Sequence, residues 1–129
     1  MLQKEVVDRM AAEPGSKAYG RLGIMLGCHL SVESLFDVPP EAFAPPPEVN
    51  SAVVRLDPLP PGTFDIRDEN ELSALVAKAF SQRRKTLRNS LKGVADEDDL
   101  AAVGIDSGLR PEQVSIADYV ALCNHLLQK

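Results

Sequence analysis

The chain has 129 residues, of which 44% are hydrophobic, and it carries a formal net charge of −5 at pH 7. This length suits one ordinary domain or two small ones, and the apolar content suffices for a folded core, which excludes a disordered chain. No apolar run approaches the ~18 residues needed to span a bilayer, and no secretory signal core follows Met1. We therefore expect a soluble cytoplasmic protein without a membrane partner.

The two cysteines, Cys28 and Cys123, are isolated thiols that lack the close spacing of zinc ligands. His29 and His125 lie near them in the sequence, so two Cys-His pairs could converge in space. Buried, reduced cysteines are the better interpretation. We predict no bound metal.

The first twelve residues predict a short helix that follows a brief apolar start. Val6, Val7 and Met10 recur at helical spacing. Pro14 and Gly15 end this helix, because both residue types disfavour its continuation.

A second apolar segment runs from Ala18 to about His29. It predicts a buried helix, although each of its three glycines costs about 1 kcal/mol relative to alanine. Gly23 and Gly27 have the spacing of closely packed backbones. In so short a segment we interpret this spacing as packing against a sheet rather than as pairing in a membrane.

Two strands joined by a proline-rich loop are expected next. Residues 30–38 alternate loosely between apolar and polar side chains, and residues 51–56 form a short β-branched run. The prolines between them remove backbone donors and restrict the preceding residues, which excludes a helix or an interior strand. Residues 39–50 are therefore expected to be a semi-rigid loop, and we place a domain boundary between Pro60 and Asp68.

Beyond this boundary the apolar spacing is helical. The apolar positions of one helix, or of this helix and its successor, are Leu72, Leu75, Val76, Ala79, Phe80, Leu87 and Leu91. A further helix is expected over residues 95–103 and ends at Gly104. Ser115 and Asp118 form a start similar to a capping box for a last helix. The residues that this helix is expected to bury are Ile116, Tyr119, Val120, Cys123, Leu126 and Leu127.

A basic block lies within this helical half. Between Leu72 and Ala95 the chain has six basic residues and no acidic one, although the whole chain has 14 basic and 19 acidic residues. The six are Lys78, Arg83, Arg84, Lys85, Arg88 and Lys92. Exposed charges act over roughly 8 Å at physiological salt, so the local sign outweighs the total. The block indicates a polyanionic partner, and its alternative is a solvated helix face.

The chain has no glycine-rich phosphate loop, no nucleophile elbow and no zinc-protease motif. Its first sixty residues resemble the end of a larger α/β unit, without the βαβ start that binds a nucleotide. We therefore expect that a preceding part is missing, and that the chain has no catalytic or cofactor-binding residues of its own.

Four collinear segments are similar to the C-terminal half of the bacterial small-subunit ribosomal RNA adenine dimethyltransferases. They are Met1–Arg9, Ala18–Leu22, Phe36–Leu56 and Ala79–Leu91. The resemblance covers essentially the whole chain in order. Any one of these segments would be weak evidence, but four in the right order make coincidence improbable.

The resemblance implies a mixed α/β plus α fold. Residues 1–60 would be the incomplete C-terminal part of a Rossmann-like methyltransferase sheet, and residues 61–129 a small helical RNA-binding domain. The full-length enzyme would use S-adenosylmethionine to dimethylate N6 of two adjacent adenines near the 3′ end of small-subunit ribosomal RNA. The donor-binding and catalytic motifs of the family match no position here. We therefore expect this chain to bind immature small ribosomal subunits, to bind no S-adenosylmethionine, and to be inactive alone.

The resemblance also implies a target-adenine pocket in the proline-rich loop. Phe43 matches the aromatic residue that flanks the flipped adenine, and Pro45 and Pro46 would hold it with little ordering cost. Stacking on an aromatic face returns about 1–3 kcal/mol per base. The alternative is that Phe43 is a hydrophobic plug beneath the loop.

The basic segment matches the part of the family that grips ribosomal RNA. The residues implied are Arg83, Arg84, Lys85 and Arg88. Arginine suits bidentate contact with phosphate, and Arg84 and Arg88 would share a helix face. Ion pairing with acidic residues in the range 96–99 is the competing interpretation.

Lys4 and Arg21 are further candidates for RNA contact, on the side of the catalytic domain. Internal ion pairs with Glu5 or Asp8 are an equally good interpretation of both residues.

Two other functions stay open at this point. The chain could be a non-catalytic ribosome-assembly module that recognises the immature small subunit and occludes it. It could instead belong to the related large-subunit ribosomal RNA adenine methyltransferases that confer macrolide resistance. The runs Phe36–Pro40 and Gln82–Leu91 favour the small-subunit branch.

Overall fold

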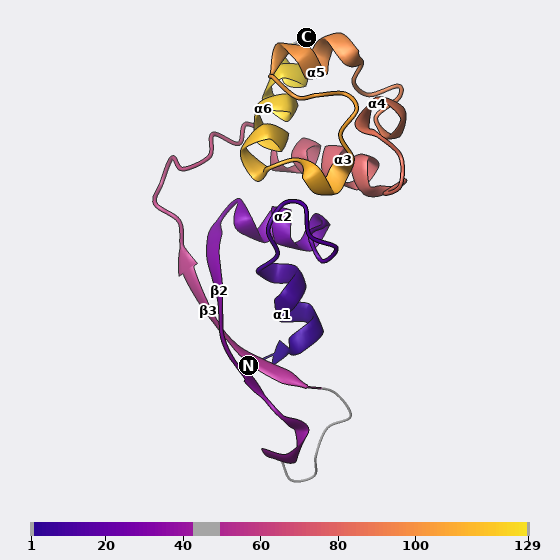
Figure 1. The fold of residues 1–129 in the computed structure, drawn as a ribbon. Helices are drawn as coiled ribbons and strands as arrows, with labels where there is room; N and C mark the ends of the chain where they lie inside the picture. Colours follow the sequence, from indigo (N-terminus) through magenta and orange to yellow (C-terminus); the bar gives the residue numbers. More distant parts are fainter. Residues whose placement is uncertain (1, 43–49, 129) are drawn as a thin grey trace.

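The computed structural model describes residues 2–42 and 50–128, so the predicted pocket residues Phe43, Pro45 and Pro46 lie outside the described residues. Figure 1 shows a long two-stranded ribbon with one helix beside it at one end of the molecule. A cluster of short helices forms the other end, and a further helix lies between the two ends.

The N-terminal elements are β1 (Leu2–Gln3), α1 (Lys4–Met10) and α2 (Arg21–Gly27), which confirms both helices predicted in this region. The prediction that the two glycines of α2 pack against a sheet is wrong. A Cβ atom at Gly23 would lie 2.7 Å from the carbonyl oxygen of Arg9 on α1, and one at Gly27 would meet the side chain of Ile116. Both glycines therefore allow close approach of helical neighbours.

The two predicted strands are present as β2 (Leu30–Val38) and β3 (Ser51–Pro58), and a short 3₁₀ turn at Pro40–Ala42 follows β2. The sheet has the order β1-β3-β2, and both pairs are antiparallel. A register shift between Ser34 and Phe36 leaves Leu35 as an extra residue in β2. This bulge explains the loose apolar alternation of the strand, because the side-chain phase changes at Leu35.

The helical half begins with α3 (Glu69–Phe80), where the Asp68 side chain accepts a hydrogen bond from the backbone N–H of Glu71 at 3.1 Å. The next helix, α4 (Leu87–Ser90), is separated from α3 by a turn over residues 81–86. The backbone N–H of Leu87 donates to the carbonyl of Leu109 at 2.8 Å. The apolar positions beyond Phe80 therefore belong to a successor helix with long-range partners.

The remaining elements are α5 (Glu97–Ala102), a 3₁₀ turn (Pro111–Gln113) and α6 (Ile116–Leu127). Gly104 has a φ of 78° and ends α5 as predicted. Ser115 caps α6 by accepting a hydrogen bond from the N–H of Asp118 at 3.2 Å. The prediction that Leu127 is buried is wrong, since the helix runs past the core and leaves this side chain 40% exposed.

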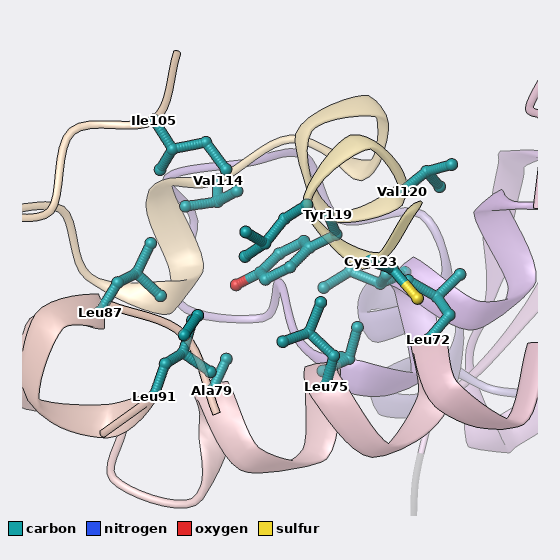
Figure 2. Packing of buried hydrophobic residues seen from close by; sticks show 14 of the residues in the cluster. Leu72, Leu75, Ala79, Leu87, Leu91, Ile105, Val114, Tyr119, Val120 and Cys123 are labelled. Carbon is teal, nitrogen blue, oxygen red and sulfur yellow. The ribbon is translucent and has the colours of Figure 1, made fainter. Parts of the chain in front are cut away.

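One hydrophobic core joins α2 to the helical cluster. Figure 2 shows the Tyr119 ring in this core, between the α3 residues Leu75 and Ala79 on one side and Val114 on the other. The Tyr119 hydroxyl donates to the carbonyl of Pro111 at 2.6 Å, and the Tyr19 hydroxyl donates to the carbonyl of Val114 at 2.7 Å. Both buried hydroxyl groups are thus satisfied.

The cysteines are buried free thiols, as predicted. Burial raises the pKa of Cys28 to about 11 and also raises the pKa of Cys123. Residues 2–42 and 50–128 contain no group of three His, Cys, Asp or Glu side chains that could hold a metal ion. Within the same ranges, no helix is long and apolar enough to cross a membrane.

Candidate nucleic-acid interface

The basic turn, which we define as residues 81–86, carries three of the predicted RNA-binding residues between α3 and α4. Arg83, Arg84 and Lys85 are all exposed there, and Arg88 is exposed on α4. The prediction that Arg84 and Arg88 share a helix face is wrong, because Arg84 precedes the start of α4. The turn instead exposes these side chains to solvent.

Arg83 connects the basic turn to the N-terminal part of the chain. Its Nη2 group donates to the carbonyl oxygens of Lys17 and Tyr19, both at 2.6 Å. Its guanidinium carbon lies 5.6 Å from the centre of the Phe80 ring, within the range of a cation–π contact. Arg83 is thus a structural brace in addition to a candidate RNA contact.

Arg84 and Lys85 differ from Arg83 because neither side chain has a hydrogen-bond or ion-pair partner in the described part of the chain. Their charges are solvated and are not offset by a fixed acidic neighbour. The backbone N–H of Lys85 donates to the carbonyl of Gln82 at 2.9 Å, which closes the turn beneath these side chains.

Arg88 follows the competing interpretation from the sequence. Its Nη1 group lies 3.1 Å from Oε1 of Glu97, within the acidic range 96–99. The two side chains are 58% and 57% exposed. Exposed pairs of this kind contribute about 0–1 kcal/mol, so a phosphate could displace Glu97 at little cost.

Lys4 also has acidic neighbours, one of which was predicted. Its Nζ atom lies 3.5 Å from Oδ1 of Asp8 and 3.5 Å from Oδ2 of Asp37. Asp37, and then Asp8, raise the pKa of Lys4. The side chain therefore links α1 to the end of β2.

Arg21 has neither of the expected ion pairs. Its Nη2 group donates to the hydroxyl of Ser73 at 3.3 Å, which links α2 to α3, and Glu5 is paired with Arg9 at 2.7 Å instead. A bond to a neutral hydroxyl leaves the positive charge of Arg21 uncompensated.

Arg21 and Arg83 line a cavity of about 400 Å³ together with two basic residues that the sequence did not single out. These are Arg9, at the end of α1, and Lys17, in the connection to α2. Their sequence signal, a local excess of positive charge, is weak, because both residues lie in the half of the chain where acidic and basic residues alternate. Only the fold brings four cations together from separate elements.

The described residues do not fit S-adenosylmethionine. Four glycines adopt positive φ, namely Gly15, Gly62, Gly93 and Gly104, and each lies in a different turn with open space around it. Isolated turns of this kind cannot form the glycine-rich loop that lets a backbone approach a nucleoside closely. The cavity beside Arg83 is cationic, whereas a ribose site needs an acidic residue.

Solved structures with a similar fold include a dimethyladenosine transferase and an rRNA methyltransferase. A dimethyladenosine transferase from Plasmodium falciparum aligns with a TM-score of 0.78 and 25% identity, over 93% of this chain and 53% of that one. The 23S rRNA methyltransferase ErmE aligns with a TM-score of 0.67 and 22% identity, over 98% of this chain and 52% of that one. At this identity the second match shows the fold alone. The fold is therefore that of a methyltransferase part, mixed α/β with a small sheet.

The family follows from the sequence matches. The model of the ribosomal RNA adenine dimethylase family matches residues 1–128. A ribosomal RNA small subunit methyltransferase A from Chromobacterium violaceum is 57% identical over 100% of this chain and 49% of its own length. One from Legionella pneumophila (strain Corby) is 56% identical over 98% of this chain and 49% of its own length. The chain belongs to the ribosomal RNA adenine dimethylase family.

The match confirms the predicted resemblance. This family consists of S-adenosylmethionine-dependent methyltransferases. The chain spans about half the length of the curated relatives that it matches.

Proposed function

We propose that this chain is the RNA-binding part of a dimethyltransferase that modifies N6 of two adjacent adenines near the 3′ end of small-subunit ribosomal RNA. The observation that carries the proposal is the basic turn, where Arg84 and Lys85 are exposed and unpaired among the described residues, in a chain of this family. The partner is the immature small ribosomal subunit, and the location is the cytoplasm. The methyl donor of the whole enzyme is S-adenosylmethionine.

The proposal is supported by whether each basic side chain already has an acidic or polar partner. A cation that is already paired gains little from a phosphate, because the new contact replaces an existing one. Arg84 and Lys85 have no such contact to lose within the described ranges, so each phosphate they meet releases a condensed counterion and adds affinity. Arg88 can join them once it leaves Glu97.

We further propose a division of labour along the chain. Residues 1–60 form the C-terminal part of a Rossmann-like methyltransferase sheet, and residues 61–129 form the helical RNA-binding domain. Phe43, Pro45 and Pro46 belong to the target-adenine pocket, in the loop between β2 and β3. Lys4 and Arg21 extend the RNA surface on the side of the catalytic domain. The positions of β2 and β3 on either side of the loop support this arrangement.

We also propose that these 129 residues do not methylate RNA alone, because the described residues do not fit the donor. The purified chain should incorporate no labelled methyl group into undermethylated small subunits. Incorporation above that of a boiled sample would contradict this proposal.

The test of RNA binding is the salt dependence of affinity for immature small subunits. We expect log K to fall linearly with log salt, and the variant Arg84→Ala/Lys85→Ala to show a slope shallower by roughly 1.5 to 2. Affinity at ~0.1 M salt should fall at least about 30-fold, because the two lost charged contacts contribute about 1 kcal/mol or more each. Arg83 is kept unchanged, since its loss would also remove the brace to Lys17 and Tyr19.

The matched control is Lys92→Ala, which removes an exposed cation of the same basic block from a turn beyond α4. This variant should bind like the parent chain. If Lys92→Ala weakens binding as much as the double variant, the interaction is a diffuse field and not a site. If neither variant weakens binding, the basic turn does not contact RNA.

A further inference from the structure

We propose that the cavity lined by Arg9, Lys17, Arg21 and Arg83 holds one phosphodiester group of the bound RNA. We call this cavity the cationic cleft. The proposal rests on the proposed function and deepens it, since it adds Arg9 and Lys17 as RNA contacts and assigns them a defined position. It also gives Arg83 two roles, one toward the protein and one toward the phosphate.

The cleft is assembled from separate segments. Arg9 comes from the end of α1, Lys17 from the following connection, Arg21 from the first position of α2, and Arg83 from the basic turn. The two hydrogen bonds from Arg83 to the carbonyls of Lys17 and Tyr19 hold the basic turn against this connection. Arg83 is thus held against the segment that carries Lys17 before any ligand binds, which lowers the cost of ordering.

The charges of the cleft are largely uncompensated. Among the described residues that line it there is no carboxylate. Arg21 donates to a hydroxyl and Arg83 to two carbonyls, all of them neutral acceptors. Arg9 is paired with Glu5, but the two side chains are 56% and 77% exposed, so this pair is weak and can open. Several cations held close together without acids repel one another, and an anion between them relieves that repulsion.

The size of the cleft suits a phosphate group of an RNA backbone. Its volume of about 400 Å³ lies within the range of about 300–1,000 Å³ that is typical of small-ligand sites, and it has room for a phosphate with a flanking sugar. Ala18, which has a small side chain, and Gly20, which has none, are part of its lining. A Cβ atom at Gly20 would lie 3.8 Å from Nη1 of Arg83, at ordinary contact distance. The Nη1 group of Arg83 therefore faces the space that Gly20 leaves free.

Gly20 allows the cleft to be blocked without changing a charge. Its backbone is extended, with φ −168°, a conformation that any residue adopts. The variant Gly20→Leu should place its side chain in the cleft and reduce affinity for immature small subunits about 10-fold, because it excludes the phosphate from the four cations. Gly20→Ala adds only an ordinary contact, so its loss of affinity should be clearly smaller than that of Gly20→Leu.

The charge variant Arg9→Ala/Lys17→Ala should lose a similar factor. Its salt slope should be shallower by about one, as expected for one phosphate contact. The combination of Gly20→Leu with this double variant should be no weaker than either alone, because both remove the same contact. Thermal unfolding of each variant confirms that the measured chains are folded.

The outcomes separate this proposal from the proposed function. If Arg9→Ala/Lys17→Ala and Gly20→Leu bind like the parent chain while Arg84→Ala/Lys85→Ala is impaired, the cleft is not a phosphate site and the RNA-binding function stands. If the losses of affinity from Gly20→Leu and from Arg9→Ala/Lys17→Ala are strictly additive in the combined variant, the cleft is also not a phosphate site. If Arg84→Ala/Lys85→Ala binds like the parent chain as well, the proposed function itself fails.

Discussion

The hairpin of β2 and β3 and the helical cluster contain similar apolar side chains but bury them very differently. None of the nine residues of β2 is fully buried, and its Leu35 and Phe36 are 47% and 59% exposed. In α3, by contrast, Leu72 and Val76 are completely buried. The helices cover one another, whereas the hairpin is contacted by α1 and, through β2, by α2, which leaves most residues of β2 exposed. Apolar content therefore indicates a core only where a second element is present to cover it.

The helix α2 belongs with the helical cluster, although it lies in the first sixty residues. Ile24 and Cys28 share the hydrophobic core with α3 and α6. The Tyr19 hydroxyl donates a hydrogen bond to the carbonyl of Val114, in the helical half. The core thus contains residues from both sides of the boundary predicted between Pro60 and Asp68. We therefore expect apolar side chains on both sides of this boundary to stabilise the same core.

The largest expected effect comes from a cavity in the core. Leu72→Ala removes a side chain that is 0% exposed and should lower the free energy of unfolding by about 3 kcal/mol, since both the transfer energy and the packing around it are lost. The matched change Leu35→Ala in the hairpin should stay within about 0.5 kcal/mol. Urea denaturation measures both values. A loss above about 2 kcal/mol for Leu35→Ala would show that the hairpin is covered in solution.

The helical elements could be predicted because their signals are local. Asp68 and Ser115 each accept a hydrogen bond from an N–H three residues later, and Gly104 supplies the positive φ that ends α5. The β2 strand was predicted for a similar reason, but the bulge at Leu35 was not, because register depends on the partner strand.

The candidate interface could be predicted only in part. The composition of the basic block was visible in the sequence, but the break between α3 and α4 was not, because Gln82–Lys85 are acceptable helix formers. The start of α4 depends instead on the carbonyls of Ser107 and Leu109, about twenty residues away. The brace from Arg83 and the convergence of Arg9 and Lys17 depend on similar long-range contacts. A single sequence does not show such contacts.

A smaller expected effect is a loss of stability in alkali that originates in the shared core. Burial, and then the charge of Glu69, raise the pKa of Cys28 from 9.0 to about 11. Below pH 9 both the folded and the unfolded thiol keep their proton. Between pH 9 and 11 only the unfolded thiol ionises, so the free energy of unfolding should fall by up to about 2–3 kcal/mol.

The variant Cys28→Ala isolates this contribution. Tyr19 and Tyr119 also have raised pKa values through burial, and they contribute to alkaline unfolding in both proteins. The difference between the two stability curves should therefore shrink as the pH rises from 9 to 11. Parallel curves over this range would mean that Cys28 is open to solvent, and that α2 does not share the core.

The smallest expected effect tests how firmly the N-terminal part joins the helical cluster. Tyr19→Phe removes the hydroxyl that donates to the carbonyl of Val114 across 95 residues of sequence, and Tyr119→Phe removes the one that donates to Pro111 within the helical half. Each change leaves a buried carbonyl without this donor, so each should cost about 1–2 kcal/mol in urea denaturation with an unchanged m-value. Equal losses would mean that the segment preceding α2 is held as tightly as α6. A neutral Tyr19→Phe beside a costly Tyr119→Phe would mean that the N-terminal part detaches before the helical cluster unfolds, and the core would then be two units.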